Sequence, residues 1–194
     1  MRVFWVALVA GCGFETPAPV GTKAGVDQGA GFDAAMCPES YSAALPGTSR
    51  YRLIASAGAP AWVQSDLCNL DLPGATHLVV FETTAEVVAV SGLVDTTSGI
   101  SRGAVWIGAV QERSAITARD NWLGFDGRPL IEAWSTGEPN DGTVEDHREQ
   151  FAQIQQGRRY FTDSAGTDTN GALCECDGKS IPSNVVDAIT DNRP

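Results

Sequence analysis

The chain has 194 residues, and 43% of them are hydrophobic, which is enough to bury one core of ordinary size, so we expect a single globular domain. Its formal net charge at pH 7 is -11, which repels phosphate backbones and anionic lipid surfaces. Nucleic acid is therefore not expected among its partners.

Residues 1–12 resemble a bacterial lipoprotein signal peptide. One cation, Arg2, precedes a short apolar run that ends at Val9-Ala-Gly-Cys12, a sequence similar to a lipobox. The run falls well short of the roughly 20 apolar residues that a membrane-spanning helix needs. The resemblance implies lipidation of Cys12, and multiple acyl chains hold a protein stably at a membrane. We therefore expect an exported bacterial membrane lipoprotein, in the outer membrane or at the cell surface; an ordinary secretory peptide and a misassigned start are the alternatives.

Two segments lack the apolar periodicity of a folded element. Residues 13–36 are rich in glycine, alanine and proline and cannot bury enough surface to offset the entropy of ordering, so they predict a flexible linker. Residues 177–194 predict a polar C-terminal tail, although Ile181 to Ile189 could dock on the domain. The folded domain is thus expected to cover residues 37–176.

The first half of that region begins with a predicted helix. Pro60 suits a first helical turn, and Val63, Leu67 and Leu70 follow at helical spacing. We expect a short amphipathic helix whose inner face also carries Cys68.

The following segments predict a strand, a second helix and a loop-rich second half. His77–Phe81 is a β-prone run, and Thr83-Thr-Ala-Glu86 forms a capping box in front of the apolar residues that start at Val87. From Val105 onward, glycine, aspartate, proline and tryptophan interrupt short segments, as is typical of loops and small strands. The predicted class is α+β.

Four cysteines remain after Cys12, and an even number in an exported chain predicts two disulfides. Cys174 and Cys176 are separated by one residue and are expected to bond to different partners, so that Cys37 and Cys68 are shared between them. A metal or redox site is the alternative, but Cys-x-Cys lacks the two-residue spacing and the neighbouring histidines of such sites.

The stretch Trp134–Asp146, WSTGEPNDGTVED, places four acidic residues and an asparagine around one proline. Calcium takes about 6–8 oxygen ligands from carboxylates, amide and backbone carbonyls and water, and this stretch supplies several. The same residue types also form polar surface turns. From these residues alone, both interpretations remain open.

Several short motifs follow one another in an order that resembles the C-type lectin-like domain. They are the Cys68 helix, Gly74-Ala-Thr-His-Leu-Val79, the Thr-Ala-Glu helix, Val105-Trp-Ile-Gly108, Phe125-Asp-Gly127, Trp134-Ser-Thr-Gly-Glu-Pro-Asn140, Glu145-Asp146 and Cys174-Glu175. The resemblance extends over about residues 37–176. It implies a double-loop fold in which two helices flank small antiparallel sheets and a long loop region carries the binding site.

The resemblance also implies how the cysteines pair. The implied disulfides are Cys68–Cys174 and Cys37–Cys176. The family's inner disulfide has no counterpart, because His147 and Gly166 stand where its two cysteines would be. The long loop is therefore expected to be less constrained, since a native disulfide typically contributes about 2–4 kcal/mol.

For the acidic stretch, the resemblance implies a calcium-dependent carbohydrate site. The implied calcium ligands are Glu138, Asn140, Glu145 and Asp163, with Pro139 in a cis peptide. The sugar would contact these four ligands and Thr162. The family has asparagine where this chain has Thr162, and a hydroxyl is a shorter and weaker ligand than an amide carbonyl. Glu138-Pro-Asn140 resembles the version of the motif that selects mannose, fucose or glucose.

Some further residues have simpler expected roles. Interior packing is expected for Trp62, Trp106 and Trp134. Trp122 lies in a polar loop and is the better candidate for exposure. Asp141 and Glu112 could serve an auxiliary ion, but Gln111 stands where such a site needs a carboxylate, so no auxiliary site is expected.

The expected function is glycan binding, with Ca²⁺ as cofactor, by a domain that meets a membrane only through its lipid anchor. The alternative is a calcium-independent module on the same fold that binds a surface protein. An enzyme is not expected, because the sequence has no nucleophile elbow and no paired histidine ligands, and its clustered carboxylates lie in one loop.

Overall fold

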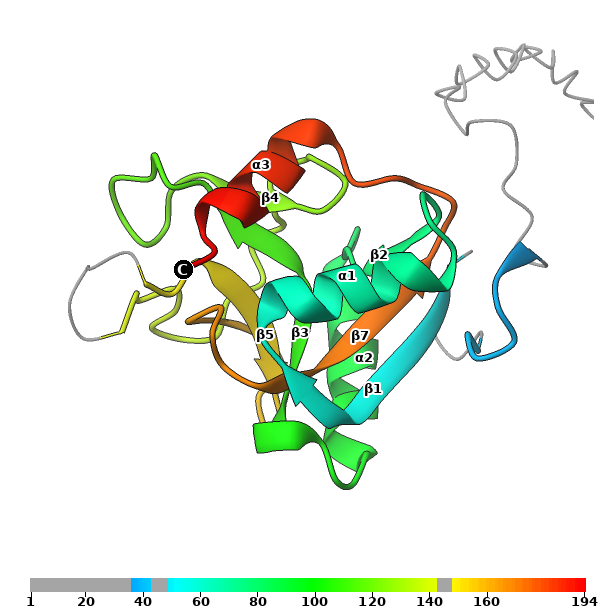
Figure 1. Cartoon of the computed structure of the whole chain (residues 1–194). Helices are drawn as coiled ribbons and strands as arrows, with labels where there is room; N and C mark the ends of the chain where they lie inside the picture. Colours follow the sequence, from blue (N-terminus) through cyan, green and yellow to red (C-terminus); the bar gives the residue numbers. More distant parts are fainter. Residues whose placement is uncertain (1–35, 43–48, 143–147) are drawn as a thin grey trace, which may run out of the picture. The chain divides into compact units, whose positions relative to one another are not determined.

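The computed structural model of the chain describes residues 36–42, 49–142 and 148–194 (Figure 1). Its helices are α1 (Ala61–Asp71), α2 (Thr84–Thr96), the 3-10 turn η2 (Ser101–Gly103) and α3 (Ser183–Asp191). Its strands are β1 (Arg50–Ala59), β2 (Thr76–Leu78), β3 (Ala104–Gln111), β4 (Trp122–Gly124), β5 (Phe151–Gln155), β6 (Phe161–Ser164) and β7 (Asn170–Cys176). The predicted signal peptide and nearly all of the predicted linker lie outside the described residues.

The strands form one mixed sheet. Its order is β1-β7-β3-β5-β6, with β2 paired to β7 and β4 paired to β3. The β3–β7 pair is parallel, and the other pairs are antiparallel. The hairpin of β5 and β6 therefore stands at one edge of the sheet, directly after the long connection that leaves β4.

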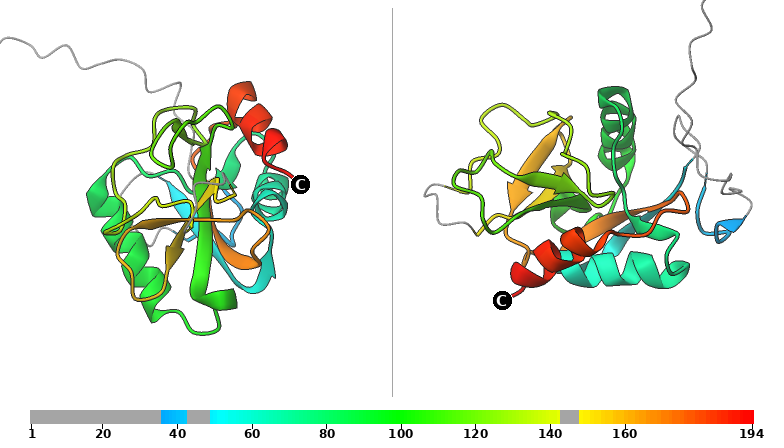
Figure 2. Two further views of the ribbon diagram at one scale, coloured as in Figure 1. Left: turned by 90° about the vertical axis from the view of Figure 1, so that its left-hand side faces the viewer. Right: turned by 90° about the horizontal axis from the view of Figure 1, so that it is seen from above.

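Two hydrophobic clusters fill the two faces of this sheet. On β3, Trp106 packs in the cluster that contains α1 and α3, whereas Val105 and Ile107 pack in the cluster that contains α2. Side chains alternate between the faces of a strand, so a strand covered on both faces is apolar throughout. Figure 2 shows α1 and α2 separated by the sheet. The predicted α+β class, with two helices flanking the sheet, is confirmed.

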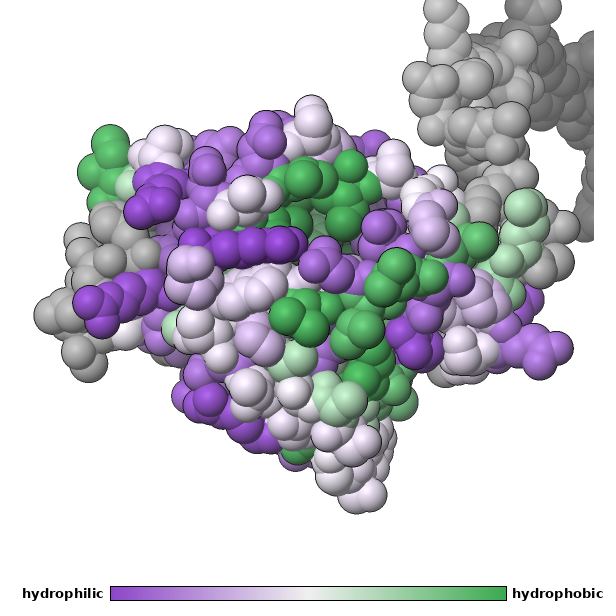
Figure 3. Space-filling model, in the orientation of Figure 1, coloured by the Kyte–Doolittle hydropathy of each residue, from purple (hydrophilic) through white to green (hydrophobic). Residues whose placement is uncertain are grey.

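Helix α1 forms where predicted, but the prediction of its inner face is partly wrong. Cys68 is buried, whereas Val63, Leu67 and Leu70 are exposed, and hydrophobic residues are visible over α1 in Figure 3. The buried face instead carries the small residues Ala61 and Ser65 together with Gln64. The amide of Gln64 donates to Ala57 O at 2.6 Å and to Asn170 O at 3.0 Å, so burial leaves its donor satisfied.

Helix α2 begins at the predicted cap. The Thr83 hydroxyl accepts a hydrogen bond from Glu86 N at 3.2 Å. The Glu86 carboxylate accepts from Glu82 N at 3.0 Å and from the Tyr51 hydroxyl at 2.5 Å, so this side chain joins the helix start to β1. The cap therefore satisfies local donors and also anchors the helix to the sheet.

Both disulfides end on β7. The bonds are Cys37–Cys176 and Cys68–Cys174, the pairs that the family resemblance implies. Residues two apart on a strand share a face, and both β7 cysteines lie in the cluster beneath α1. The bonds therefore tie α1 and the start of the described chain to β7, an interior strand of the sheet.

The C-terminal segment is an ordered helix and not a polar tail. Val185, Ala188 and Ile189 of α3 are buried in the cluster beneath α1. The helix is amphipathic, and these apolar residues recur at helical spacing among polar ones. The alternative considered for this segment, docking of Ile181 to Ile189, is what the structure shows. No helix among the described residues is long and apolar enough to cross a membrane.

The predicted exposure of Trp122 is wrong. It is the first residue of β4 and is 6% exposed. Its indole N–H donates to Ala118 O at 2.7 Å, and its ring lies 4.8 Å from that of Trp134 in an edge-to-face arrangement. The Trp122 ring can be buried under a polar loop because its one polar group, the indole N–H, has a backbone acceptor in that loop.

Candidate functional site

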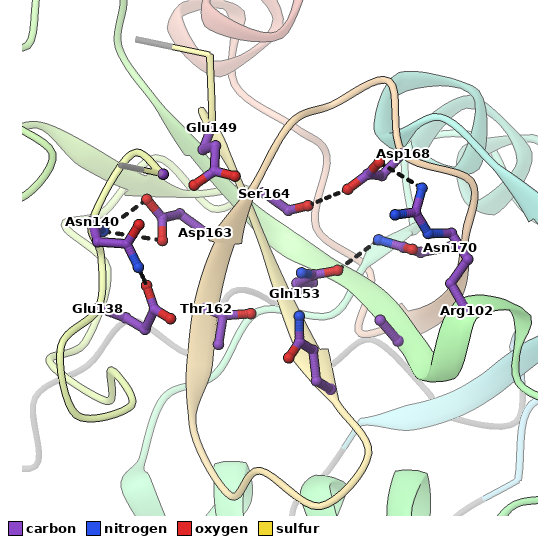
Figure 4. Close-up of a pocket in the computed structure, with 13 residues that line it drawn as sticks. Arg102, Glu138, Asn140, Glu149, Gln153, Thr162, Asp163, Ser164, Asp168 and Asn170 are labelled. Carbon is purple, nitrogen blue, oxygen red and sulfur yellow. Dashed lines mark hydrogen bonds and ion pairs between the residues drawn. The ribbon is translucent and has the colours of Figure 1, made fainter. Parts of the chain in front are cut away.

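A polar groove runs across the β5–β6 hairpin, with a volume of about 300 Å³ (Figure 4). Its wall is formed by Arg102, Ala104, Glu138, Asn140, Gly142, Glu149, Gln153, Gln155, Thr162, Asp163, Ser164, Asp168 and Asn170. Except for Ala104 and Gly142, each of these residues carries a polar side chain. The groove brings together residues from the long loop, the hairpin, η2 and the start of β7.

One end of the groove gathers three of the predicted calcium ligands. Asp163 on β6 accepts hydrogen bonds from Asn140 N at 3.0 Å and from Asp141 N at 2.6 Å. The Asn140 amide donates to the Glu138 carboxylate. The Glu138–Pro139 peptide is cis. Glu138, Asn140 and Asp163 thus lie side by side, as the family resemblance implies. We call this part of the groove the acidic end.

Basic side chains support the loop at this end. Arg158 pairs with the Glu138 carboxylate at 3.3 Å, and Arg119 donates to the Glu138 backbone carbonyl at 2.9 Å. Burial and the neighbouring Asp163 carboxylate nevertheless raise the pKa of Glu138. The pairing with Arg158 therefore offsets only part of the repulsion between the neighbouring carboxylates.

Glu149 also belongs to the acidic end, and the sequence did not indicate it. Burial, and after it the charge of Asp163, raises the pKa of Glu149 to about 7. Its backbone N–H donates to Asp141 at 3.1 Å. Glu149 stands two residues before β5, outside the paired residues of the β5–β6 hairpin, in which Asp163 pairs with Ala152. The path by which the chain enters β5 brings Glu149 to the acidic end, and no sequence spacing reveals that path.

Thr162 lies in the floor of the groove. It is 2% exposed, and its hydroxyl oxygen has no hydrogen-bond partner among the described residues. Figure 4 shows the hydroxyl turned toward Gln153 and away from Glu138. The family pattern has asparagine at this position, and an asparagine amide would reach further than the Thr162 hydroxyl does.

Other predicted residues lie elsewhere. Glu145, a predicted ligand, and Cys12, the predicted lipidation site, fall outside the described residues. Gln111 is buried, and its amide donates to Thr117 O and Asp120 O, both at 2.9 Å, so its N–H groups hold the loop in place.

The donors at the acidic end suit a hard cation. Glu138, Glu149 and Asp163 supply carboxylate oxygens, and Asn140 supplies an amide carbonyl. Among the described residues, no sulfur or imidazole lines the groove. Such an all-oxygen set matches Ca²⁺ better than a transition metal. A divalent cation there would favour the charged form of each carboxylate and reverse the pKa shifts of Glu138 and Glu149.

Comparison with solved structures identifies the fold. No protein-family model and no curated protein matches the sequence. The chain is similar to the C-type lectin CEL-I from Cucumaria echinata, with 18% identity over 72% of this chain and 96% of that one and a TM-score of 0.56. It is similar to the carbohydrate-recognition domain of the mouse scavenger receptor C-type lectin, with 18% identity over 75% of this chain and all of the other and a TM-score of 0.56.

A third similar structure is the C-type lectin domain of murine dendritic cell inhibitory receptor 2, in complex with N-glycan. It shares 19% identity over 73% of this chain and 98% of that one, with a TM-score of 0.55. At these identities the comparisons establish the fold alone, and the fold is the C-type lectin-like one.

Proposed function

We propose that this chain is a carbohydrate-binding lectin-like domain that holds Ca²⁺ at the acidic end of its groove. The observation that carries the proposal is the convergence of Glu138, Asn140, Glu149 and Asp163 on one polar wall. The predicted ligand Glu145 is part of the same proposal. Solved neighbours on this fold include a complex with N-glycan and a complex with GlcNAc, which supports a glycan as the partner.

The sugar class we propose is mannose, glucose or fucose. The basis is the Glu138-Pro-Asn140 motif, with its carboxylate and amide held side by side by a hydrogen bond. A pair of vicinal equatorial hydroxyls would coordinate the ion and donate to these groups in charge-assisted hydrogen bonds.

The first experiment is the thermal midpoint of the chain in calcium and in chelator. A ligand that binds only the folded state stabilises it by RT ln(1 + [L]/Kd), about 2.7 kcal/mol at a hundredfold excess over Kd. For a domain of this size that corresponds to a rise of roughly 5–10 °C. Magnesium at the same ionic strength controls for general screening of the charge of -11.

Two variants sharpen this experiment. Glu149→Gln removes one carboxylate from the acidic end and should abolish most of the calcium-dependent rise. Asp66→Asn removes an exposed carboxylate that pairs with Arg193 at 3.4 Å, outside the groove, and should keep the full rise. If the parent chain shows no rise at millimolar calcium, the calcium proposal is wrong.

A second candidate is calcium-independent recognition of a surface protein. Thr162 favours it, because the hydroxyl there is a poorer ligand than an amide. A calcium-independent type II antifreeze protein has the same fold at 19% identity and a TM-score of 0.55. If calcium leaves the thermal midpoint unchanged while the chain still binds host or bacterial cells, this candidate replaces the first.

We propose binding without catalysis. The carboxylates gather on one wall of the groove, as for cation binding, and solved neighbours on this fold are lectin domains. Hydrolysis of an oligosaccharide by the chain, lost in Glu138→Gln, would contradict this.

We also propose that the chain is exported and held at a bacterial membrane by acyl chains on Cys12. The support is the lipobox-like ending of residues 1–12. Cys12→Ser should move the protein from the membrane fraction to the soluble fraction and end its labelling with a radioactive fatty acid. Equal labelling of both forms would contradict lipidation at this residue.

A further inference from the structure

The groove continues well beyond the proposed calcium ligands. From Thr162 it extends over Gln153 and Gln155 of β5 to Asn170 of β7, and its far wall is Arg102 with Asp168. Figure 4 shows Glu138, Asn140 and Glu149 on one side of the hairpin and Arg102, Asp168 and Asn170 on the other. We call the second part the amide floor. An ion and one sugar ring at the acidic end would leave this part of the groove uncovered.

The groups of the amide floor are held in place before any ligand arrives. The Asn170 amide donates to Gln153 Oε1 at 2.6 Å. The Ser164 hydroxyl donates to Asp168 at 2.7 Å, and Arg102 pairs with the same carboxylate at 2.6 Å. Polar groups fixed by their neighbours bind a ligand with little further loss of conformational freedom.

One buried group of the floor lacks a partner. The Thr162 hydroxyl is buried, has no hydrogen-bond partner among the described residues, and faces Gln153. A buried polar atom without a partner is uncommon in folded proteins and calls for a partner such as water. The half-buried Gln155 side chain also lines the groove and makes no hydrogen bond within the described part of the chain. Its amide offers an incoming molecule both a donor and an acceptor.

The charge of the groove decides which molecule fits. Among the described residues that line the amide floor, the charged side chains are Arg102 and Asp168, and they neutralise each other at 2.6 Å. A floor without net charge offers no free counter-charge to an ionised ligand. Amides and hydroxyls that offer both donors and acceptors match uncharged hydroxyl groups instead.

We infer that the amide floor is a second sugar subsite, which takes the neighbouring uncharged unit of a glycan whose first unit lies at the acidic end. This inference rests on the proposed function. It deepens that proposal from recognition of a single sugar to recognition of an uncharged oligosaccharide of at least two units.

The test compares one sugar unit with two. The full chain, purified in detergent with calcium present, is titrated calorimetrically with methyl α-mannoside and with the α1→2, α1→3 and α1→6 mannobioses. The same series is repeated with methyl α-glucoside and its disaccharides. We expect at least one disaccharide to bind about tenfold more tightly than the methyl glycoside, as a few added hydrogen bonds would give.

Variants locate the second unit. Gln155→Ala and Arg102→Gln should lower the affinity for that disaccharide about fivefold and leave the affinity for the methyl glycoside within about twofold. Asn69→Ala, an exposed position outside the groove, should change neither affinity.

The outcomes separate this inference from the proposed function. If the methyl glycoside binds and no disaccharide binds more tightly, or if the gain survives both floor variants, the second subsite does not exist. If a disaccharide with a uronic acid binds more tightly than its neutral counterpart, the assignment to uncharged sugars is wrong. If no sugar of either size binds in calcium, the proposed function itself is wrong, and the inference of a second subsite is wrong with it.

Discussion

Thr162 is the residue at which this chain departs from the family pattern of the proposed calcium site. Its hydroxyl is buried beside the acidic end, where the family pattern has an asparagine, and it is too short to reach as far as an amide carbonyl. Calcium binding sums many oxygen contacts, so one added neutral ligand raises affinity without adding charge repulsion. A cation held more closely would also stabilise the charged forms of Glu138 and Glu149, whose pKa values are raised.

Thr162→Asn is therefore expected to tighten calcium binding about tenfold, which corresponds to about 1.4 kcal/mol. Calorimetric titration with calcium measures the change. Thr96→Asn, at an exposed position near the end of α2, is the matched control and should leave the affinity unchanged. An unchanged or weaker affinity for Thr162→Asn would count against the ion site at the acidic end.

At the scale of elements, the contact between β2 and β7 contains a buried charged cluster. His77 donates from Nδ1 to Leu78 O at 2.8 Å and from Nε2 to Asp177 at 3.0 Å. Because both partners are acceptors, both ring nitrogens carry protons and the imidazole is a cation. The ring then has no lone pair for a metal. His77 instead forms an ion pair with Asp177, and the Glu175 carboxyl lies close to both.

This cluster makes stability depend on pH. The hydrogen bond to Asp177 and the charge of Glu175 raise the pKa of His77 against the opposing effect of burial. Burial raises the pKa of Glu175 from 4.5 to about 7. Both groups hold protons more tightly in the folded than in the unfolded state. Their contribution to stability is therefore present near pH 5 and is lost as the pH rises through 7.

Glu175→Gln should flatten this dependence. The variant keeps an oxygen that can accept from Val80 N, now at 2.9 Å, and removes the titrating carboxyl. Between pH 5 and 8 it should lose less free energy of unfolding than the parent chain, by on the order of 2 kcal/mol. Urea unfolding in chelator at pH 5, 6.5 and 8 measures this, with the exposed Glu132→Gln as control. Equal slopes for the parent chain and Glu175→Gln would contradict the assignment.

At the scale of the whole molecule, local sequence signals were enough to predict the fold. The helix cap at Thr83 and the order of short motifs predicted the α+β class, and the family resemblance implied both cysteine pairs found in the structure. The face of α1 was not predictable from hydrophobicity, because the Cys68 bond and small residues decide which side packs on the sheet. The burial of Trp122 depends on Ala118 O, a loop carbonyl that no sequence pattern reveals.

The candidate site was predictable only in part for a related reason. Residues close in sequence, such as Glu138 and Asn140, carry a readable motif. Glu149 joins them through the path of the chain into β5, and Arg102 and Asn170 reach the groove from elements far apart in the chain. A site built by tertiary packing has no local signature, so the amide floor appears only in the folded molecule.

The two disulfides should stabilise the folded chain without affecting calcium binding at the acidic end. Cys37–Cys176 spans 139 residues and Cys68–Cys174 spans 106, and both join outlying segments to β7. Each constrains the unfolded chain by closing a long loop, and the entropy of closure grows only slowly with length. The two bonds should therefore contribute similarly.

Replacing Cys37 and Cys176 together by alanine should lower the free energy of unfolding by about 3–4 kcal/mol, and replacing Cys68 and Cys174 by about the same amount. Urea unfolding of both double variants measures these losses. Because the acidic end is built from the long loop and the β5–β6 hairpin, the Cys37/Cys176 variant should keep its calcium-dependent rise in thermal midpoint. A loss below about 1 kcal/mol would show that the bond adds little to the packed core. Disappearance of the calcium response would instead show that the groove depends on the N-terminal attachment to β7, and stability and binding would then be coupled through the sheet.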